Sequence, residues 1–350
     1  MNKHLFPYKW NLADGYLSAN IQKNNYNVFG TFICGGGSTM GYKLAGFNHL
    51  GGVEIDPPIA DIYKTNHNPK HLYKLDIREF NKLKNLPTEL FNLDILDGSP
   101  PCSTFSMAGS REKAWGKEKV FREGQTKQSL DDLVFVYCDT IIKLQPKVFL
   151  LENVKGIIQG NAKVYSKNIV KKMNDAGYNV QVFCLNAASM GVPQKRERVF
   201  FIGHKKEFNL PKLKLEFNEK AIPFGEIKTE ENQYYLSENM KKVWDNRIKG
   251  DLDFSCTMGR IANRPNSYFN HNYIYKNNVA NTLATTGLNT LFDEPRYFNN
   301  TETKLIGTYP LDYNFKKIEP KYLIGMSVPP VMTAQIANQI KIQWLDKLSL

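Results

Sequence analysis

The sequence has little cysteine and no long apolar run. Its 350 residues include 5 cysteines, an odd number with no Cys-x-x-Cys pair, which argues against a disulfide framework and a structural zinc site. The longest apolar runs, such as residues 148–151, are far shorter than the roughly 20 residues that cross a bilayer. Residues 1–10 mix Lys, His and Pro and show no signal peptide. We therefore expect a protein of a reducing, cytoplasmic compartment, with no membrane span and no metal.

Acidic residues are too few to balance the basic ones. Forty-six Lys and Arg stand against 34 Asp and Glu, a formal net charge of +12. This surplus is compatible with a polyanionic partner such as DNA or RNA, although a basic surface that only keeps the protein soluble gives the same count. With 42% hydrophobic and 23% charged residues, the chain has the composition of a folded protein of one or two domains.

Internal repeats and low-complexity tracts are also missing, and β and α patterns alternate instead. Strands are predicted at residues 28–33, 52–56, 93–96, 148–151, 180–185 and 199–202, and helices at 38–44, 131–144 and 161–176. Alternating β and α segments favour an α/β fold, a parallel sheet with helices on both faces.

The alternation stops after residue 204. Residues 205–296 are rich in Asn, Lys, Tyr and Glu with weak periodicity, which suggests a separate, irregular domain that is mostly strand or loop. Order returns near the C-terminus, where Pro329-Pro330 precedes an apolar-periodic segment over 331–345 that predicts a helix. We therefore predict one domain of residues 1–204 plus 297–350 and a smaller one of residues 205–296.

A glycine turn follows the first predicted strand. Gly35, Gly36 and Gly37 open a helix, so a ligand could approach the backbone closely at the positive end of that helix. Glu54 ends the next strand about 20 residues later, where an acid can accept hydrogen bonds from ribose hydroxyls. The pair suggests a nucleoside-containing cofactor, and a purely structural turn followed by an acid is the alternative.

A cysteine follows another predicted strand. Cys102 comes directly after Pro100 and Pro101, and a polar segment that ends in Gly109 follows it. A lone cysteine is most often a small buried hydrophobe. The prolines and the polar segment favour an accessible loop instead, where a thiolate nucleophile would lie.

Charged groups end or precede two further strands. Glu152 follows an apolar strand that would desolvate its carboxyl group and favour the protonated form, making it a proton donor. The alternative is an acid at a helix N-terminus with no chemistry. Arg196 and Arg198 precede the strand at 199–202, and strand alternation would direct both to one face. A solvated charge run is the alternative there.

Taken in order, four segments resemble motifs of the DNA cytosine-5 methyltransferases. They are residues 32–37, Pro100-Pro101-Cys102, Glu152-Asn153-Val154 and residues 194–198. Residues 305–313 and 325–330 resemble the family's C-terminal motifs. The resemblance implies a Rossmann-like class I methyltransferase sheet in the larger domain and a target-recognition domain at 205–296.

The resemblance also implies a reaction. Cys102 would add to C6 of a cytosine flipped out of duplex DNA, which makes C5 able to attack the methyl group of S-adenosylmethionine and leaves S-adenosylhomocysteine. Glu152 would act at N3. Arg198 is favoured over Arg196 to hold O2, so Arg196, the fourth residue of the catalytic set, would be structural or anchor the loop. Methylation would then protect host DNA from a restriction endonuclease that acts on the same site without binding the enzyme. The family mechanism needs only a monomer. We expect this monomer to be associated with the nucleoid because it binds DNA.

Two sets of binding residues are carried over from the resemblance. The cofactor set is Phe32, Gly35, Gly36, Gly37, Glu54 on the ribose, Ile55, Asp76 near the adenine amino group, Ile77, Pro100, Ser327 and Val328. The DNA set is Ser103, Ser106, Arg260, Arg264, Thr282 and Leu283. The sequence also departs from the family pattern at Cys34, Ser103 and Met326. None of these departures removes a group that the reaction requires, so we expect an active enzyme.

Three other functions compete with this interpretation. A related tRNA cytosine methyltransferase has a Cys-Phe-Thr segment that this sequence lacks. A catalytically silent DNA-binding protein would not need Cys102, Glu152 and Arg198. A nicotinamide dehydrogenase would account for the glycine turn and Glu54 but for none of the other motifs.

Overall fold

The computed structural model describes residues 4–101, 133–231, 234–263 and 271–348. The chain forms two compact units, each assembled from three segments. Unit 1 comprises Met1–Gly15, Ala187–Arg196 and Asn218–Val331, and unit 2 comprises Tyr16–Asn186, Glu197–Phe217 and Met332–Leu350. The predicted recognition domain at 205–296 therefore lies mostly in unit 1, together with residues 297–331, which we had assigned to the larger domain. Among the described residues, no helix is both long and apolar enough to cross a membrane.

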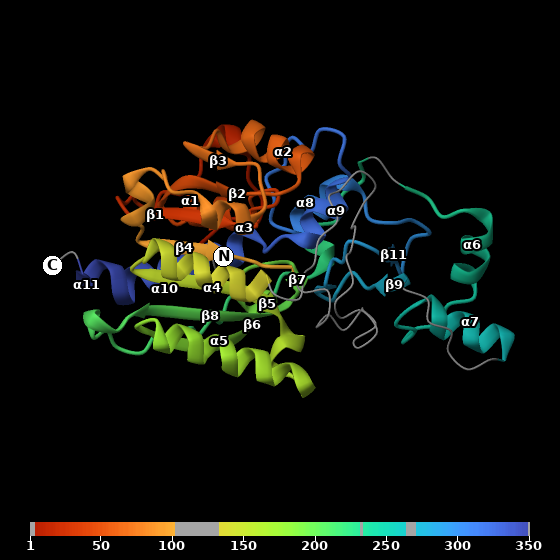
Figure 1. Ribbon diagram of the computed structural model, residues 1–350. Helices are drawn as coiled ribbons and strands as arrows, with labels where there is room; N and C mark the ends of the chain where they lie inside the picture. The colour runs from red at the N-terminus through yellow and green to blue at the C-terminus, as the bar shows by residue number, and fades with distance from the viewer. Residues whose placement is uncertain (1–3, 102–132, 232–233, 264–270, 349–350) are drawn as a thin grey trace. The chain divides into compact units, whose positions relative to one another are not determined.

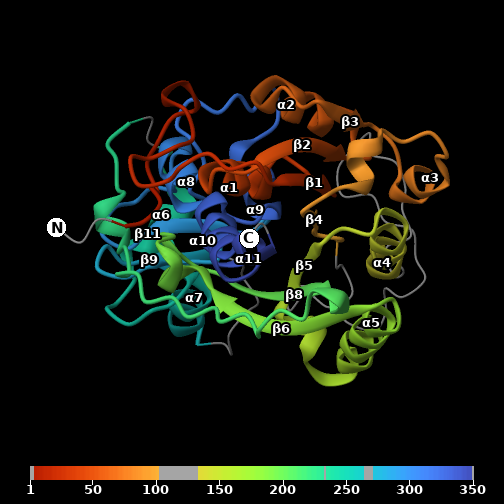
Figure 2. The ribbon, with the colours of Figure 1, turned by 90° about the vertical axis from the view of Figure 1, so that its left-hand side faces the viewer.

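A seven-stranded sheet forms the centre of unit 2 (Figures 1 and 2). Its strands are β1 (Asn27–Thr31), β2 (Asn48–Val53), β3 (His71–Tyr73), β4 (Ile95–Gly98), β5 (Val148–Val154), β6 (Tyr178–Asn186) and β8 (Glu197–Lys205). They are ordered β3-β2-β1-β4-β5-β8-β6. The pairs formed by β1 to β5 are parallel, and β8 runs antiparallel to β5 and β6. The predicted α/β sheet is thus confirmed, with one reversed strand that a buried apolar run could not reveal.

Helices cover both faces of this sheet. They are α1 (Gly37–Leu44), α2 (Pro57–His67), α3 (Ile77–Lys82), α4 (Leu133–Leu144), α5 (Lys163–Asp175), α10 (Pro330–Ile340) and α11 (Asp346–Leu348). Figure 2 shows α3, α4 and α5 along one face and α1 and α10 along the other. The helix predicted at 331–345 is α10 followed by a π-helical turn at Lys341–Leu345. Short 3-10 turns lie at Leu12–Asp14, Thr88–Phe91, Lys155–Ile158, Gly160–Ala162, Ala187–Met190, Lys206–Phe208 and Phe224–Glu226.

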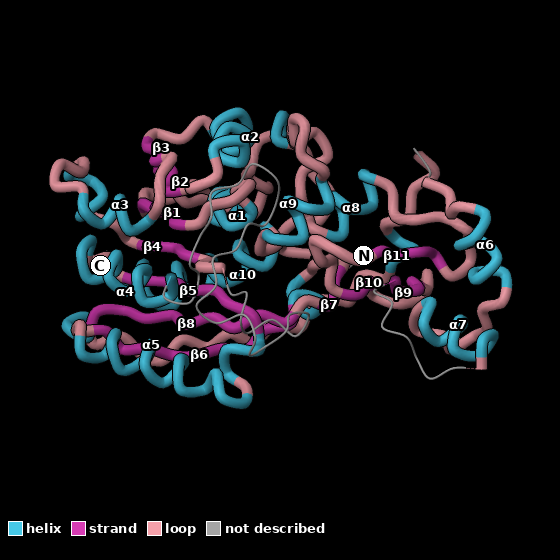
Figure 3. The backbone as a smooth tube through the Cα atoms, turned by 45° about the vertical axis from the view of Figure 1, so that its right-hand side comes forward, coloured by secondary structure: helices cyan, strands magenta, loops and turns pink. Residues whose placement is uncertain are grey.

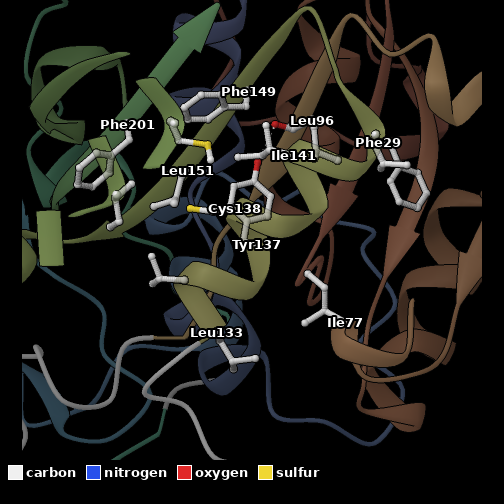
Figure 4. Close-up of a cluster of buried hydrophobic side chains, with 14 of the residues drawn as sticks. Phe29, Ile77, Leu96, Leu133, Tyr137, Cys138, Ile141, Phe149, Leu151 and Phe201 are labelled. Atoms are coloured by element: carbon white, nitrogen blue, oxygen red, sulfur yellow. Dashed lines mark hydrogen bonds between the residues drawn. The ribbon is translucent and has the colours of Figure 1, made fainter. Parts of the chain in front are cut away.

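One hydrophobic core of unit 2 lies between the sheet and the helices α3, α4 and α5. Phe29, Leu96 and Phe149 from the strands pack with Leu133 and Ile141 from α4 (Figure 4). Tyr137 points from α4 to the sheet, and its hydroxyl group lies 2.8 Å from the Leu96 carbonyl oxygen and 2.9 Å from that of Leu150. The one polar atom of this large buried side chain therefore has partners on both β4 and β5.

Unit 1 is built from shorter elements. The strands β7 (Gln194–Lys195) and β10 (Ala280–Asn281) form one parallel pair, and β9 (His271–Ile274) and β11 (Leu288–Leu291) form another. Its helices are α6 (Glu238–Asp245), α7 (Phe254–Ala262), α8 (Asn300–Ile306) and α9 (Pro320–Met326). Figure 3 shows α6 and α7 beside the β9-β11 pair. Residues 205–296 are therefore not only strands and loops, and the caps Ser237 and Asp253 were the available sequence signals for the two helices.

Candidate active site

The turn between β1 and α1 has an unusual backbone. Phe32, Cys34 and Gly36 have φ angles of 54°, 47° and 78°, in the left-handed region that non-glycine residues rarely adopt. The Gly36 N–H donates to the Ile33 carbonyl at 2.8 Å, and the Met40 N–H donates to the Gly36 carbonyl at 2.8 Å. Strained backbone of this kind is concentrated at ligand-binding and catalytic sites, so this turn is a candidate ligand-binding element of unit 2.

Glu54 is buried at the end of β2 and is held by backbone groups. The Cys34 N–H donates to its Oε2 and the Asp56 N–H donates to its Oε1, each at 2.9 Å. Burial raises the pKa of Glu54 to about 7, an effect that these hydrogen bonds partly oppose. The carboxyl group is therefore fixed beside the glycine turn, where sequence analysis predicted it.

A hollow lies next to this acid. Its lining consists of Phe32, Val53, Glu54, Ile55, Leu75, Asp76, Ile77 and Leu133. The structure thus brings together Phe32, Glu54, Ile55, Asp76 and Ile77 of the predicted cofactor set. The Asp76 carboxylate accepts from the Arg78 backbone N–H at 2.7 Å as the N-cap of α3, and it also pairs with the Arg78 guanidinium at 3.1 Å. Apolar walls with two acids suit an aromatic base and a hydroxylated sugar.

The end of β4 leads to Pro100 and then to Cys102. The Asn153 side chain donates from Nδ2 to the Pro100 carbonyl oxygen at 3.3 Å. On β4 itself, Asp97 is buried, and its Oδ1 accepts a hydrogen bond from the Tyr42 hydroxyl at 3.2 Å. Burial raises the pKa of Asp97 to about 7, and the nearby Glu152 charge adds to this effect. Sequence analysis did not select Asp97 or assign a role to Asn153.

Glu152 and Arg198 form an ion pair across two neighbouring strands. The Arg198 Nε lies 3.0 Å from the Glu152 Oε1, and the two side chains are 14% and 11% exposed. Glu152 on β5 is opposite Phe200 on β8, so Arg198, two residues from Phe200, projects from the same face of the sheet. Burial lowers the pKa of Arg198, and the attraction of Glu152 opposes that change. The pair presents a carboxyl group and a guanidinium side by side.

Arg196 has a different environment in unit 1. It lies in neither β7 nor β8, so the alternation predicted for Arg196 and Arg198 does not hold. Its buried guanidinium donates to the Leu283 carbonyl at 3.2 Å and to the Gly325 carbonyl at 3.1 Å. These contacts match the structural or anchoring role that was one of the two expectations for Arg196.

Thr282 and Leu283, predicted to contact DNA, bond to residues 194–196. The Thr282 hydroxyl donates to the Lys195 carbonyl at 2.6 Å, and the Leu283 N–H donates to the Gln194 Oε1 at 2.9 Å. The Leu283 side chain is buried, and the buried Gln194 side chain also donates to the Ile306 carbonyl at 3.2 Å. Sequence analysis did not single out Gln194 for this role.

The remaining predicted residues fall into two groups. In unit 1, Ser327 and Val328 are buried, and the Ser327 Oγ accepts from the Tyr309 hydroxyl at 2.7 Å. Arg260, on α7, forms an ion pair with Asp251 at 2.8 Å. Cys102, Ser103, Ser106 and Arg264 lie outside the residues that the structure describes.

Comparison with known proteins decides the family. A family model described as C-5 cytosine-specific DNA methylase matches residues 26–342. The chain belongs to this family. Its curated relatives include the Type II methyltransferase M.FnuDI of Fusobacterium nucleatum, 34% identical over 220 residues that cover 63% of this chain and 56% of the relative. Another is M1.HphI of Haemophilus parahaemolyticus, 28% identical over 338 residues that cover 88% of this chain and 85% of the relative.

Solved structures share the fold of this methylase family member. A triple mutant of DNMT2 from Spodoptera frugiperda superimposes with a TM-score of 0.65 at 17% identity, covering 90% of this chain and 99% of that one. The Dnmt2 methyltransferase of S. pombe gives a TM-score of 0.60 at 15% identity, covering 91% and 99%. The resemblance read from the sequence motifs is thereby confirmed at the level of family and fold.

Family membership gives meaning to one departure in this methylase. Cys34 stands where the family's first motif normally has glycine, and its φ of 47° is a conformation that glycine adopts without steric cost. A backbone conformation that suits glycine is therefore occupied by a cysteine here. Another departure, Met326, is the last residue of α9.

Proposed function

We propose that the chain transfers a methyl group from S-adenosylmethionine to C5 of a cytosine in duplex DNA, as the modification enzyme of a type II restriction-modification system. One observation carries the proposal. The strained glycine turn, the hollow with Glu54 and the Glu152–Arg198 pair all lie within unit 2, at the carboxyl ends of β1, β2 and β5 and the start of the antiparallel β8. Ligands bind at this edge of open α/β sheets.

The lining of the hollow has the chemistry that the nucleoside part of S-adenosylmethionine would require. Glu54 would accept hydrogen bonds from the ribose hydroxyls, and Asp76 would face the adenine amino group between the apolar side chains of Ile55 and Ile77. The backbone of Gly35 to Gly37 would contact the methionine part. Pro100, Ser327 and Val328 are the remaining residues that the family resemblance assigns to the cofactor. When bound, this cofactor supplies an activated methyl group on a sulfonium.

The chain's own residues would supply the remaining chemistry. The Cys102 thiolate forms a bond to C6 of cytosine, and the electrons of the C5–C6 double bond become available at C5 to accept the methyl group. Glu152 holds a proton at N3, and Arg198 donates to O2, so the pair stabilises the charge that develops on the ring. A base then removes the C5 proton, and the electrons of that bond re-form the double bond and expel Cys102.

The target base must leave the DNA stack to reach this site. Ser103 and Ser106 would contact the DNA, and residues 205–296 would read its sequence through Arg264 and neighbouring polar side chains. Arg260, Thr282 and Leu283 belong to the predicted DNA-binding set, and they also form contacts within unit 1. We therefore propose that they stabilise the recognition segment in addition to contacting DNA. We propose that the enzyme acts as a cytoplasmic monomer on the DNA of the nucleoid.

Transfer of labelled methyl groups tests this function. Wild-type protein, Cys102→Ser and the control Cys184→Ser, which removes an exposed cysteine on the edge strand β6, are each incubated with labelled S-adenosylmethionine and either mixed-sequence duplex DNA or tRNA. We expect 5-methylcytosine in DNA with the wild type and the control and none with Cys102→Ser.

Other results would overturn particular parts of the proposal. If tRNA were labelled and DNA were not, the proposed substrate would be wrong and the enzyme would be an RNA methyltransferase. DNA binding without labelling of either nucleic acid would indicate a silent binding protein. Where DNA is labelled, bisulfite sequencing gives the recognition sequence.

A further inference from the structure

We propose that His67 is a positioning residue for the glycine turn between β1 and α1, because its ring contacts Gly35 and Gly36 and holds them in place. This inference rests on the proposed function, since it assigns His67 a role in S-adenosylmethionine binding. His67 is the last residue of α2 and belongs to none of the family motifs that the sequence displays.

The contacts with the turn are direct. The His67 Nε2 lies 3.2 Å from the Gly35 carbonyl oxygen. A carbonyl oxygen only accepts hydrogen bonds, so the proton must be on Nε2. Nδ1 is then the acceptor of the Tyr16 hydroxyl at 3.4 Å. Together the two contacts fix both the tautomer and the orientation of the ring.

The ring also fills the space behind Gly36. A methyl group added to Gly36 would come within 2.2 Å of the His67 Nε2, much closer than non-bonded atoms can approach. Gly36 is thus required both by its φ of 78° and by the ring against it. The turn and the ring fit each other, so a change in the ring would alter the position of the turn.

His67 is itself firmly held in unit 2. Its ring packs against that of Tyr63, with 4.7 Å between the ring centroids, and its carbonyl oxygen accepts a hydrogen bond from the Lys43 Nζ at 3.1 Å. Burial and the Lys43 charge lower the pKa of His67 to about 3, so the ring stays neutral near pH 7.

Helix α2 connects the two sides of the proposed cofactor site. Its N-cap is Asp56, whose backbone N–H bonds to Glu54, and its last residue is His67. One helix of 11 residues therefore begins beside the acid proposed to bind the ribose and ends against the glycine turn. The turn is thus held at Cys34 by the Glu54 carboxylate and at Gly35 by the His67 ring.

Three variants separate positioning from general stability. His67→Leu removes the hydrogen-bond donor but keeps an apolar group of comparable size, and His67→Gln places an amide N–H near the position of Nε2. His204→Leu is the control, because His204 is also buried in unit 2, bonds to the Lys205 carbonyl at 2.8 Å and packs on Trp344. Hydrogen exchange of the amides at 34–37 is measured without cofactor, and calorimetry with S-adenosylhomocysteine gives the Kd.

Positioning predicts a specific pattern. His67→Leu should raise the exchange rate at 34–37 and the Kd roughly tenfold or more, because a hydrogen bond to a buried carbonyl is lost, while kcat at saturating S-adenosylmethionine changes less than about twofold. His67→Gln should recover most of the affinity, and His204→Leu should lower stability with an unchanged Kd.

Two results would overturn the assignment. The first is an exchange rate and an affinity in His67→Leu that equal those of the wild type. The second is an equal loss of affinity in His67→Gln and His204→Leu, which would show that His67 only contributes to general stability. If the wild type binds no S-adenosylhomocysteine, the proposed cofactor-binding function is wrong. The exchange data alone then show whether His67 holds the turn in place.

Discussion

Different interactions stabilise the interior of each of the two units of this methylase. Unit 2 has a core of apolar side chains from strands and helices, among them Phe29, Leu96 and Phe149. In unit 1 a fully buried arginine, Arg296, has a central place, and it bonds to both carboxylate oxygens of Glu302 at 2.9 and 3.0 Å. Apolar contacts tolerate small adjustments, whereas a buried ion pair requires both partners. We therefore expect the two units to respond differently to single substitutions.

The largest expected effect is in unit 1. Glu302→Ala leaves the Arg296 charge buried with one carboxylate partner fewer, and Glu302 also bonds to the N-cap residue Asn299 of α8. We expect the free energy of unfolding to fall by about 3–5 kcal/mol, measured by urea denaturation.

Two further variants sharpen this test. Lys171→Ala breaks an exposed pair with Asp175 on α5 and should cost less than about 0.5 kcal/mol. The double variant Arg296→Met with Glu302→Leu should recover much of the loss. A cost for Glu302→Ala no greater than that for Lys171→Ala would show that the buried pair does not hold unit 1.

The second effect concerns the buried acid of unit 2. Glu54 accepts hydrogen bonds from backbone N–H groups, whereas Glu302 is bonded to an arginine. Its pKa is raised from 4.5 to about 7, so the native state binds this proton more tightly than the unfolded state. The wild type therefore loses stability as the pH rises from below 4.5 through 7, and Glu54→Gln, which has no proton to lose, escapes that loss.

The difference between the two proteins gives the measurement. The stability of Glu54→Gln minus that of the wild type should increase by about 3 kcal/mol between pH 4.5 and pH 8, as determined by urea denaturation at several pH values. Parallel curves would contradict the raised pKa. S-adenosylhomocysteine binding should be weaker in Glu54→Gln at every pH, because an amide accepts fewer hydrogen bonds from ribose than a carboxylate.

A smaller effect is expected for catalysis at the end of β4. Asn153→Leu removes the hydrogen bond to the Pro100 carbonyl and so loosens the segment that leads to Cys102. We expect kcat for methyl transfer to fall by about tenfold to hundredfold, equivalent to about 1.4–2.8 kcal/mol, with the Kd for S-adenosylhomocysteine little changed. An unaltered kcat would contradict this positioning role for Asn153.

The smallest effect tests the strained turn. Cys34→Gly should raise the free energy of unfolding by about 0.5–1 kcal/mol, because glycine adopts the observed φ of 47° without steric cost. Cys34→Ala is the control and should gain nothing, since alanine has the same backbone restriction. An equal gain for both variants would assign the effect to the thiol and not to the backbone.

The sheet could be predicted because its signals are local. The apolar run at 148–151 marks β5, and the helical pattern at 161–176 marks α5. Glu54 could be placed from its position at the end of a strand, since parallel strands bring such positions to one edge of the sheet. Phe32 and Asp76, which line the same hollow, were carried over from the family resemblance.

The residues that sequence analysis missed act through contacts between distant parts of the chain. Asn153 bonds to a carbonyl 53 positions away, and Gln194 bonds to one 112 positions away. His67 meets Gly35 only because α2 packs where it does. The direction of β8 and the buried Arg296–Glu302 pair also depend on tertiary packing, to which hydrophobic periodicity is insensitive.

The order of the segments along the chain has a consequence for synthesis. Unit 2 includes Met332–Leu350, and in that segment Trp344 is fully buried and donates to the Pro211 carbonyl at 2.7 Å. All strands of the sheet leave the ribosome well before this segment does. Part of the apolar surface of the nascent sheet therefore stays uncovered until the whole of Asn218–Val331 has been synthesised. The rate of translation through that stretch sets how long the unfinished protein is exposed to aggregation.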